Sequence, residues 1–424
     1  MKLHIKNIAK VAEAEIDIEG ITVIAGENNT GKSTVGKALF SIFNSFNSIT
    51  QQIRNEKIYE ISRAISSLYD TWEYRLDTDF DFKAQARRIL DAYTKKKYSA
   101  STDVSQLHTF LMSFIDREFR ASEDAIDINL IFERIIHILS IENTDYMKEI
   151  LGNRLKSEFH NQINNSRESS TGTLSLQMNS IVVTASICDN EVTELSGLLV
   201  HKNNAIYIDN PFAIDEANLK PAQDFNMSSY DHKSHLRAFL SKKGNENSAI
   251  NSIIVKSKLA SVYEKLSKLV EGDLIFDSNG GYGQRITRSK KILDVRNVSA
   301  GLKAFMIIKA LLQNGSIEEK GTLILDEPEI HLHPAWQLLF AELIVLLQKE
   351  FNLHILLTTH SPYFLRAIEV FSQKYDISHR CRYYLAENHN DLAVIRDVSD
   401  QTEQIYKLLS APFQTLENER WKDD

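Results

Sequence analysis

The chain has 424 residues, of which 43% are hydrophobic, with a formal net charge of −8 and an isoelectric point near 5.9. This length allows one enlarged domain or two, and the acidic balance argues against a basic surface that coats nucleic acid. The two cysteines exclude a disulfide framework, and no apolar run reaches the roughly 18 residues of a membrane-spanning helix. Because the N-terminus leads into a strand pattern rather than a signal peptide, we expect a cytoplasmic protein without a membrane segment.

The N-terminal segment predicts three short strands followed by a phosphate-binding loop. The strands are expected at Lys2–Ile8, Ala12–Ile18 and Ile21–Ala25. The residues from Gly26 to Ser33 read G-x-x-x-x-G-K-S, and the stretch from Val35 to Phe43 has the pattern of a helix. A plain glycine-rich turn would also account for the glycines. The order strand, loop, helix favours the phosphate-binding interpretation, because that context is the one such a loop requires.

Each part of this loop has a chemical role toward a polyphosphate. Its glycines let backbone N–H groups close around the phosphates, and the dipole of the following helix adds positive potential. Lys32 supplies a charge for the β- and γ-phosphates, and Ser33 supplies a hydroxyl ligand for Mg²⁺. The sequence therefore predicts that the chain binds a nucleoside triphosphate. The expected nucleotide-binding residues are Gly26, Asn28, Asn29, Thr30, Gly31, Lys32, Ser33 and Thr34.

The segment 48–168 differs in character and predicts a helical insertion. It contains no proline and a single glycine, Gly152. Apolar residues recur at helical spacing, as from Leu107 to Ile115, so we expect a bundle of several helices. We interpret the acidic residues Asp77 and Asp79 inside it as a solvated turn rather than as part of a nuclease site.

After the insertion the pattern returns to strands and then alternates between helix and strand. The expected elements are two or three antiparallel strands over 172–200, a strand at Ala205–Ile208, and a loop or partly disordered segment over 213–233. Helices are expected near 234–241 and 250–270, and a hairpin of Asp273–Phe276 with Gln284–Thr287. From Ser299 onward the alternation is typical of an α/β core.

An apolar strand from Gly321 to Leu325 ends in two adjacent carboxylates. Asp326 would lie at the edge of the sheet beside the phosphate-binding loop, where it can hold Mg²⁺ through water. Glu327, one position later, can polarise the attacking water as a general base. Acidic residues also follow strands as helix N-caps, and Pro328 fits a helix start. The phosphate-binding loop in the same chain favours the catalytic interpretation.

Two further positions have functional and purely structural interpretations. The strand Asn352–Thr359 ends at His360, where ligands bind in open α/β sheets, so this histidine could contact the γ-phosphate. Ser299 is a good N-cap for a helix that runs to about Leu312. The same helix N-terminus could instead bind an anion, namely nucleotide held on a second subunit.

Four elements resemble, in their order along the chain, the ABC-class ATPase heads of the OLD, RecF and SMC group. They are the phosphate-binding loop, the helix start at Ser299, the strand that ends in Asp326 and Glu327, and the strand before His360. The segments Asp326–Pro334 and Thr359–Pro362 look most like the OLD-type branch. The resemblance implies an α/β fold: an ABC-type P-loop ATPase head, with a mixed sheet and an antiparallel β subdomain, into which a helical subdomain is inserted. The expected parts are an N-lobe with Walker A (1–47), the insertion (48–168), and a C-lobe with signature, Walker B and switch histidine (169–424).

The resemblance also implies roles for individual residues. Glu327 and His360 would be catalytic, and Ser33 and Asp326 would bind Mg²⁺. The expected cofactors are thus ATP and Mg²⁺. A head-to-tail dimer would close the signature residues over the partner's ATP. Those residues are Ser299, Ala300 and Gly301.

Many members of the OLD-type branch are ATPase subunits of bacterial anti-phage systems, such as Septu, PARIS and retron systems. By resemblance we expect a slowly hydrolysing regulatory or sensor subunit that forms a homodimer or higher homo-oligomer. It would control a separate effector, a nuclease, that docks partly on the helical insertion. No D-x-D follows His360 at a strand end, so no nuclease site of its own is expected. The alternatives are a RecF-like repair ATPase that binds DNA and a transporter's nucleotide-binding subunit.

Overall fold

The computed structural model describes residues 1–70, 81–95, 104–114, 125–165, 171–217, 231–242, 273–276, 281–285 and 292–420. The chain divides into two compact units. The sheet unit consists of Met1–Asn47 together with Ile150–Asp424, and the helical unit consists of Ser48–Glu149. Among the described residues, no helix combines the length and the hydrophobicity that crossing a membrane requires.

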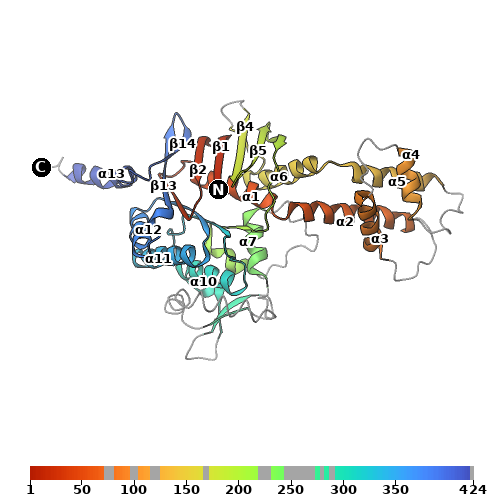
Figure 1. Cartoon of the computed structure of the whole chain (residues 1–424). Helices are drawn as coiled ribbons and strands as arrows, with labels where there is room; N and C mark the ends of the chain where they lie inside the picture. Colours follow the sequence, from red (N-terminus) through yellow and green to blue (C-terminus); the bar gives the residue numbers. More distant parts are fainter. Residues whose placement is uncertain are drawn as a thin grey trace. The chain divides into compact units, whose positions relative to one another are not determined.

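An eleven-stranded mixed sheet forms the centre of the sheet unit (Figure 1). Its order is β6-β5-β4-β1-β2-β14-β13-β3-β12-β11-β7. The strands are β1 (Lys2–Ile8), β2 (Val11–Asp17), β3 (Ile21–Gly26), β4 (Gly172–Met178), β5 (Ile181–Cys188), β6 (Glu191–Ser196), β7 (Ala205–Ile208), β11 (Thr322–Asp326), β12 (His354–Thr359), β13 (Cys381–His389) and β14 (Leu392–Asp397). The α/β fold expected from the sequence is confirmed.

The antiparallel part of the sheet is continuous with the rest. Strand β1 pairs with β4 in antiparallel register, Leu3 opposite Leu176 and Ile5 opposite Leu174. The antiparallel β subdomain expected from the sequence is therefore one end of the main sheet. All three of its strands fall within the expected range 172–200.

The parallel part of the sheet brings four strand ends to one edge. Strands β3, β12, β11 and β7 are neighbours and run parallel, so their carboxyl ends lie together. Each of these strands is buried almost throughout, which explains its continuous apolar sequence.

Helices cover both faces of these strands (Figure 1). Leu323 and Leu325 point into the large core formed with α10, α11 and α12, whereas Ile324 points toward Gly36 of α1. This alternation is the period of two that a strand requires. The helices are α1 (Lys32–Ser45), α10 (Ala300–Gln313), α11 (Pro334–Phe351), α12 (Pro362–Lys374) and α13 (Glu403–Arg420).

The helical unit has its own apolar core. Buried residues such as Ile61, Leu107 and Phe132 pack together in it. Its helices are α2 (Ile49–Asp70), α3 (Phe82–Lys95), α4 (Val104–Met112), α5 (Ala125–Ser140) and the beginning of α6 (Asn143–Phe159). The bundle of several helices expected for this segment is confirmed.

The helical unit ends at Glu149, whereas the sequence-based boundary was 168. The difference arises because the second half of α6 packs on the sheet unit. The guanidinium of Arg154 lies over the ring of Phe40 in α1, and Lys37 donates a hydrogen bond to the backbone oxygen of Glu158.

A small antiparallel sheet lies apart from the main one. Its strands are β8 (Asp273–Phe276), β9 (Tyr282–Arg285) and β10 (Ile292–Asp294). The predicted hairpin of β8 and β9 is confirmed, although β9 begins two residues earlier and a third strand joins it. The helix expected over 250–270 lies outside the described residues.

Two helical elements flank the segment after β7. A 3-10 helix, η2 (Pro211–Glu216), occupies the beginning of the expected loop over 213–233, because Asn210 caps it and Pro211 starts it. Helix α7 (His232–Leu240) begins two residues earlier than predicted, because the Asp231 side chain accepts a hydrogen bond from Ser234 N and caps it.

Candidate nucleotide-binding site

The phosphate-binding loop leaves the carboxyl end of β3 and enters α1. Glu27, Asn28 and Asn29 are exposed at its tip, where a ligand can reach their backbone. Gly31 is the N-cap of α1 and has φ +76°, a left-handed conformation that glycine adopts without a side-chain clash. The first turn of α1 therefore presents unpaired N–H groups toward the loop, as an anion site requires.

Lys32 lies inside the loop and is only 4% exposed. Its Nζ donates hydrogen bonds to the backbone oxygens of Gly26, at 3.0 Å, and of Glu27, at 2.6 Å. The same atom is 3.5 Å from Oε1 of Glu327. These contacts hold the ammonium group beside the space enclosed by the loop, where a phosphate would gain a charge-assisted hydrogen bond.

Asp326 ends β11, and two hydroxyl groups hold its carboxylate. Thr358 Oγ1 donates to Oδ1 at 2.5 Å, and the Tyr207 hydroxyl donates to Oδ2 at 2.9 Å. Both donors come from the strands on either side, since β12 carries Thr358 and β7 carries Tyr207. The orientation of this carboxylate is thus set by its two neighbouring strands.

The oxygen atoms at this position fit Mg²⁺. Asp326 is half-buried and offers carboxylate oxygens, and Ser33 is exposed in the first turn of α1. Among the residues that the structure describes, no cluster of three or more His, Cys, Asp or Glu could hold a metal by itself. Mg²⁺ commonly takes one or two protein ligands and completes its shell with phosphate and water, so Ser33 and Asp326 suit it.

Glu327 occupies a strained position between two other predicted site residues. Its φ is +48°, and its N–H donates to the backbone oxygen of Thr358 at 3.2 Å and to Thr358 Oγ1 at 3.0 Å. A left-handed non-glycine residue costs about 1 kcal/mol or more, so these bonds hold the turn in place. Glu327 Oε1 lies 3.5 Å from Lys32 Nζ, and its Oε2 lies 3.5 Å from His360 Nδ1.

A buried carboxyl group supports the end of β12. Glu329 is 2% exposed, and its Oε1 accepts hydrogen bonds from Thr359 Oγ1 at 2.5 Å and from His360 N at 3.1 Å. Burial raises the pKa of Glu329 above its ordinary value. The His360 side chain itself is 40% exposed, so its ring faces the open side of the site.

The predicted signature residues lie at the start of α10. Ser299 is the N-cap, is exposed, and makes no capping hydrogen bond with its side chain. A Cβ on Gly301 would lie 2.8 Å from the backbone oxygen of His331, so glycine lets α10 approach the loop after Asp326 closely. The role of Ser299, Ala300 and Gly301 toward a second copy stays a prediction.

Sequence reasoning missed three residues that shape this site: Tyr207, Thr358 and Glu329. Thr358 and Glu329 lie within the segments already singled out, but their pairing with Asp326 and His360 exists only across strands. Tyr207 gave no local signal, because it reads as one more apolar residue of a buried strand. Asp77 and Asp79, interpreted as a solvated turn, lie outside the described residues.

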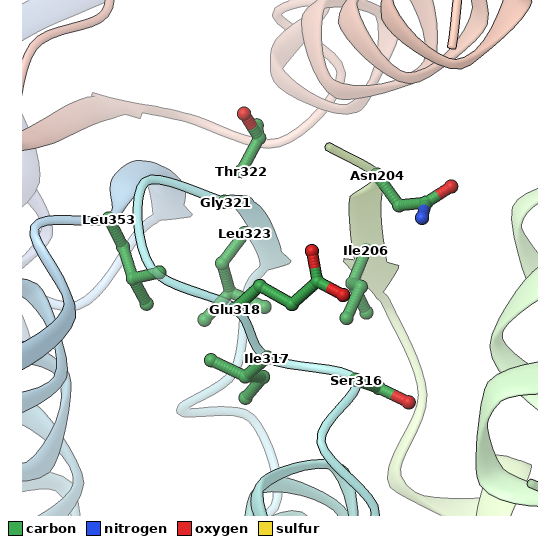
Figure 2. Close-up of a pocket in the computed structure, with 9 residues that line it drawn as sticks. All are labelled: Asn204, Ile206, Ser316, Ile317, Glu318, Gly321, Thr322, Leu323 and Leu353. Atoms are coloured by element: carbon green, nitrogen blue, oxygen red, sulfur yellow. The ribbon is translucent and has the colours of Figure 1, made fainter. Parts of the chain in front are cut away.

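A cavity lies at each end of the parallel strands. One of about 40 Å³ lies at the carboxyl ends, lined by Asp209, Asp326 and Glu327 together with apolar residues of β7, α10 and α11. Another of about 10 Å³ lies near the amino ends of β7 and β11, and Figure 2 draws its lining residues. The second holds about one water molecule at most.

The family assignment follows from the extent of the match. The family described as "AAA domain, putative AbiEii toxin, Type IV TA system" matches residues 21–366. This range runs from β3 into α12 and includes the carboxyl ends of β3, β7, β11 and β12. The chain belongs to this family. It is therefore a P-loop ATPase of the AAA type, and the expectation of an ATPase is confirmed at this level.

Three solved structures that the chain matches at low similarity are SMC head domains. One is an SMC head bound to the C-terminal winged-helix domain of ScpA (12% identity, 94% of this chain and 97% of that chain, TM-score 0.42). The second is the SMC head domain of Thermotoga maritima (15%, 94% and 98%, TM-score 0.35). The third is an Smc head with an extended coiled coil bound to the C-terminal domain of ScpA, derived from Pyrococcus furiosus (13%, 99% and 98%, TM-score 0.40).

Proposed function

We propose that this AAA-family protein binds and slowly hydrolyses ATP, and that it serves as the regulatory or sensor subunit of a bacterial anti-phage defence complex. The observation that carries the proposal is the convergence of Lys32, Glu327 and His360. They come from three separate parts of the chain. The Glu327 carboxylate, next to Asp326, lies 3.5 Å from Lys32 Nζ and 3.5 Å from His360 Nδ1. A set of charges at the carboxyl ends of parallel strands is the arrangement that nucleotide hydrolysis requires.

The residues divide the chemistry among themselves. Lys32 and the N-terminus of α1 would bind the β- and γ-phosphates. Ser33 and Asp326 would hold Mg²⁺, which neutralises phosphate charge when it is bound. Glu327 would accept a proton from the attacking water, and the exposed ring of His360 would contact the γ-phosphate.

The regulatory part of the proposal concerns other protein chains. Ser299, Ala300 and Gly301 would close over the ATP of a second copy in a head-to-tail dimer. The helical unit would provide the docking surface for a separate effector, a nuclease, whose activity depends on the nucleotide state. The family description names a toxin–antitoxin system, and a system of two components is consistent with a separate partner.

Replacing the proposed base separates binding from hydrolysis. We expect Glu327→Gln to bind ATP as the natural chain does, while the rate of hydrolysis falls by roughly 100- to 10,000-fold because proton transfer to this carboxylate is lost. Phosphate release under single-turnover conditions and a nucleotide-binding titration measure the two quantities. Lys32→Ala is the matched control and should lose binding as well. Unaltered hydrolysis by Glu327→Gln would exclude Glu327 as the base.

The partner is tested by purification from cells that carry the neighbouring genes. A co-purifying nuclease, retained with ATP and Glu327→Gln and released without nucleotide, would support the proposal. Nucleic acid that co-purifies in place of a protein, together with DNA-stimulated hydrolysis, would instead indicate a RecF-like repair ATPase.

A further inference from the structure

A buried histidine at the start of α7 lies between two carboxylates. His232 is 4% exposed, and its Nδ1 is 2.7 Å from Oε2 of Glu158 in the last turn of α6. Its backbone N–H donates to the other oxygen of the same carboxylate. Its Nε2 lies 3.1 Å from Oδ2 of Asp209, close enough for an ion pair although not aligned as a hydrogen bond. Each of the two ring nitrogens of His232 therefore faces a carboxylate.

The ring of His232 also packs flat on Tyr207. The two ring centroids are 4.3 Å apart and the planes are inclined by 24°. Tyr207 is fully buried, and its hydroxyl is the group that donates to Oδ2 of Asp326. A continuous series of contacts thus runs from Glu158 through His232 and Tyr207 to the aspartate at the end of β11.

Asp209 brings His232 to the same edge of the sheet by a second route. It follows β7 directly, and Ile208 is paired with Leu325, the residue before Asp326. Asp209 and Asp326 line the same cavity at the carboxyl ends of these strands. The imidazole therefore contacts two residues, Tyr207 and Asp209, that lie next to the proposed magnesium site.

The electrostatic surroundings keep the ring charged. Burial by itself lowers the pKa of His232, but the contacts with Asp209 and Glu158 outweigh it and raise the pKa to about 9. Two cations stand near the carboxylates as well: the Arg154 guanidinium acts on Glu158, and Lys233 Nζ is 3.6 Å from Asp209. A buried charged group of this kind has little freedom to move, because a displaced carboxylate would be left unpaired.

We propose that His232 is a positioning residue for the magnesium-binding aspartate. By holding Tyr207 and Asp209, it fixes the orientation in which the Asp326 carboxylate meets Mg²⁺, with Glu158 of α6 anchoring the imidazole from the other side. This inference rests on the proposed function, because it assumes that Asp326 binds Mg²⁺ together with ATP. The competing role is a purely structural one, in which the cluster only joins α6, β7 and α7.

The two interpretations differ in how nucleotide binding depends on magnesium. A structural loss lowers the affinity for a nonhydrolysable ATP analogue equally with Mg²⁺ and with EDTA. Loss of a group that orients a metal ligand lowers only the gain in affinity that Mg²⁺ produces. Outer-shell partners of metal ligands typically contribute about 10- to 100-fold to metal affinity, so the effect is measurable.

Two substitutions at position 232 retain one donor each. In His232→Asn the amide nitrogen replaces Nδ1 and keeps the bond to Glu158; in His232→Gln it replaces Nε2 and keeps the contact with Asp209. We expect both to reduce the Mg²⁺-dependent gain, by about tenfold for the Asn variant and by less for the Gln variant. Affinity in EDTA should stay near that of the natural chain.

A second variant and a matched control complete the experiment. Tyr207→Phe removes only the hydroxyl that reaches Asp326, and it tests the same route if the position-232 variants do not fold; the same loss is expected. His235→Phe changes a buried histidine of the same helix that packs on Phe40 and Phe239, and should leave the gain unaltered.

The outcomes separate this inference from the proposed function. An undiminished Mg²⁺-dependent gain in His232→Asn and in Tyr207→Phe overturns the positioning role while the ATPase proposal stands. If the natural chain itself binds the analogue without any gain from Mg²⁺, or does not bind it, the proposed function fails and the inference fails with it.

Discussion

At the scale of single residues, Glu329 determines how His360 is presented. Its buried carboxyl group accepts from the Thr359 hydroxyl and from the His360 N–H. We expect Glu329→Leu to lose about 1–3 kcal/mol of unfolding free energy, because both donors are left without an acceptor. It should also hydrolyse ATP more slowly, since His360 is no longer held. Urea denaturation and a hydrolysis assay measure the two effects.

Glu329→Gln is the matched control for this substitution. Its amide oxygen can accept the same hydrogen bonds, and it carries no charge into a site where burial already raises the pKa of the carboxyl group. We therefore expect stability equal to or above that of the natural chain. Equal destabilisation by the Gln and Leu variants would show that these hydrogen bonds are not what Glu329 contributes.

The same scale shows how far the site could be predicted. Lys32, Glu327 and His360 are predictable because each follows the carboxyl end of a buried strand at the spacing of its motif. Tyr207 could not be identified in this way, because its partner Asp326 is far along the chain and the pairing depends on which strand lies next to β11. Motifs record chemistry that is local in sequence, whereas supporting contacts depend on strand order.

At the scale of elements, α7 carries two histidines with opposite pKa shifts. Burial, reinforced by the charge of Arg154, lowers the pKa of His235 from 6.5 to about 3, whereas that of His232 is raised to about 9. Below pH 6.5 the unfolded chain binds a proton that folded His235 does not, so stability falls with falling pH. Above pH 6.5 folded His232 keeps a proton that the unfolded chain releases, so stability is lost again up to about pH 9.

Denaturation at a series of pH values tests whether the free energy of unfolding falls with falling pH below pH 6.5. His235→Phe keeps the ring contacts with Phe40 and Phe239, and we expect it to remove part of the acid slope, at most about 1.4 kcal/mol per pH unit. The slope is the informative quantity, because a constant packing penalty does not alter it. His379→Phe, at an exposed position, serves as the control. An acid slope that His235→Phe leaves unchanged would contradict a neutral buried His235.

Element boundaries were predictable wherever burial is continuous. Strand β7 has the bounds expected from the sequence and β11 lies within one residue of them, because an apolar run next to a carboxylate has little choice of length. Strand β1, whose burial alternates, also has the expected bounds. The third strand, β10, was missed because Ile292–Asp294 is short and partly exposed. Helix α6 was assigned to the insertion because its pattern is helical throughout, and only packing reveals that its second half belongs to the sheet unit.

For the molecule as a whole, the fold class was predictable from the sequence, whereas the continuity of the sheet was not. The pairing of β1 with β4 joins the N-terminus to a strand more than a hundred residues later, across the entire helical unit. Local periodicity contains no information about such a partner, because many exposed edges could accept the same strand. The resemblance to an ATPase head predicted the fold class but not this pairing, and the family match agrees at the level of a P-loop ATPase.

A substitution at Ser299 tests the proposed head-to-tail dimer. This residue is exposed at the N-terminus of α10 without a capping bond, so a partner's phosphate could reach it. We expect Ser299→Arg to bind ATP as a monomer but not to dimerise, because the long side chain would fill the space that the partner's nucleotide needs at the start of α10. Sedimentation velocity with ATP in the Glu327→Gln background measures the state. Ser378→Arg, at another exposed serine, should still dimerise, and a dimer that persists in Ser299→Arg would show that the signature residues do not act in trans.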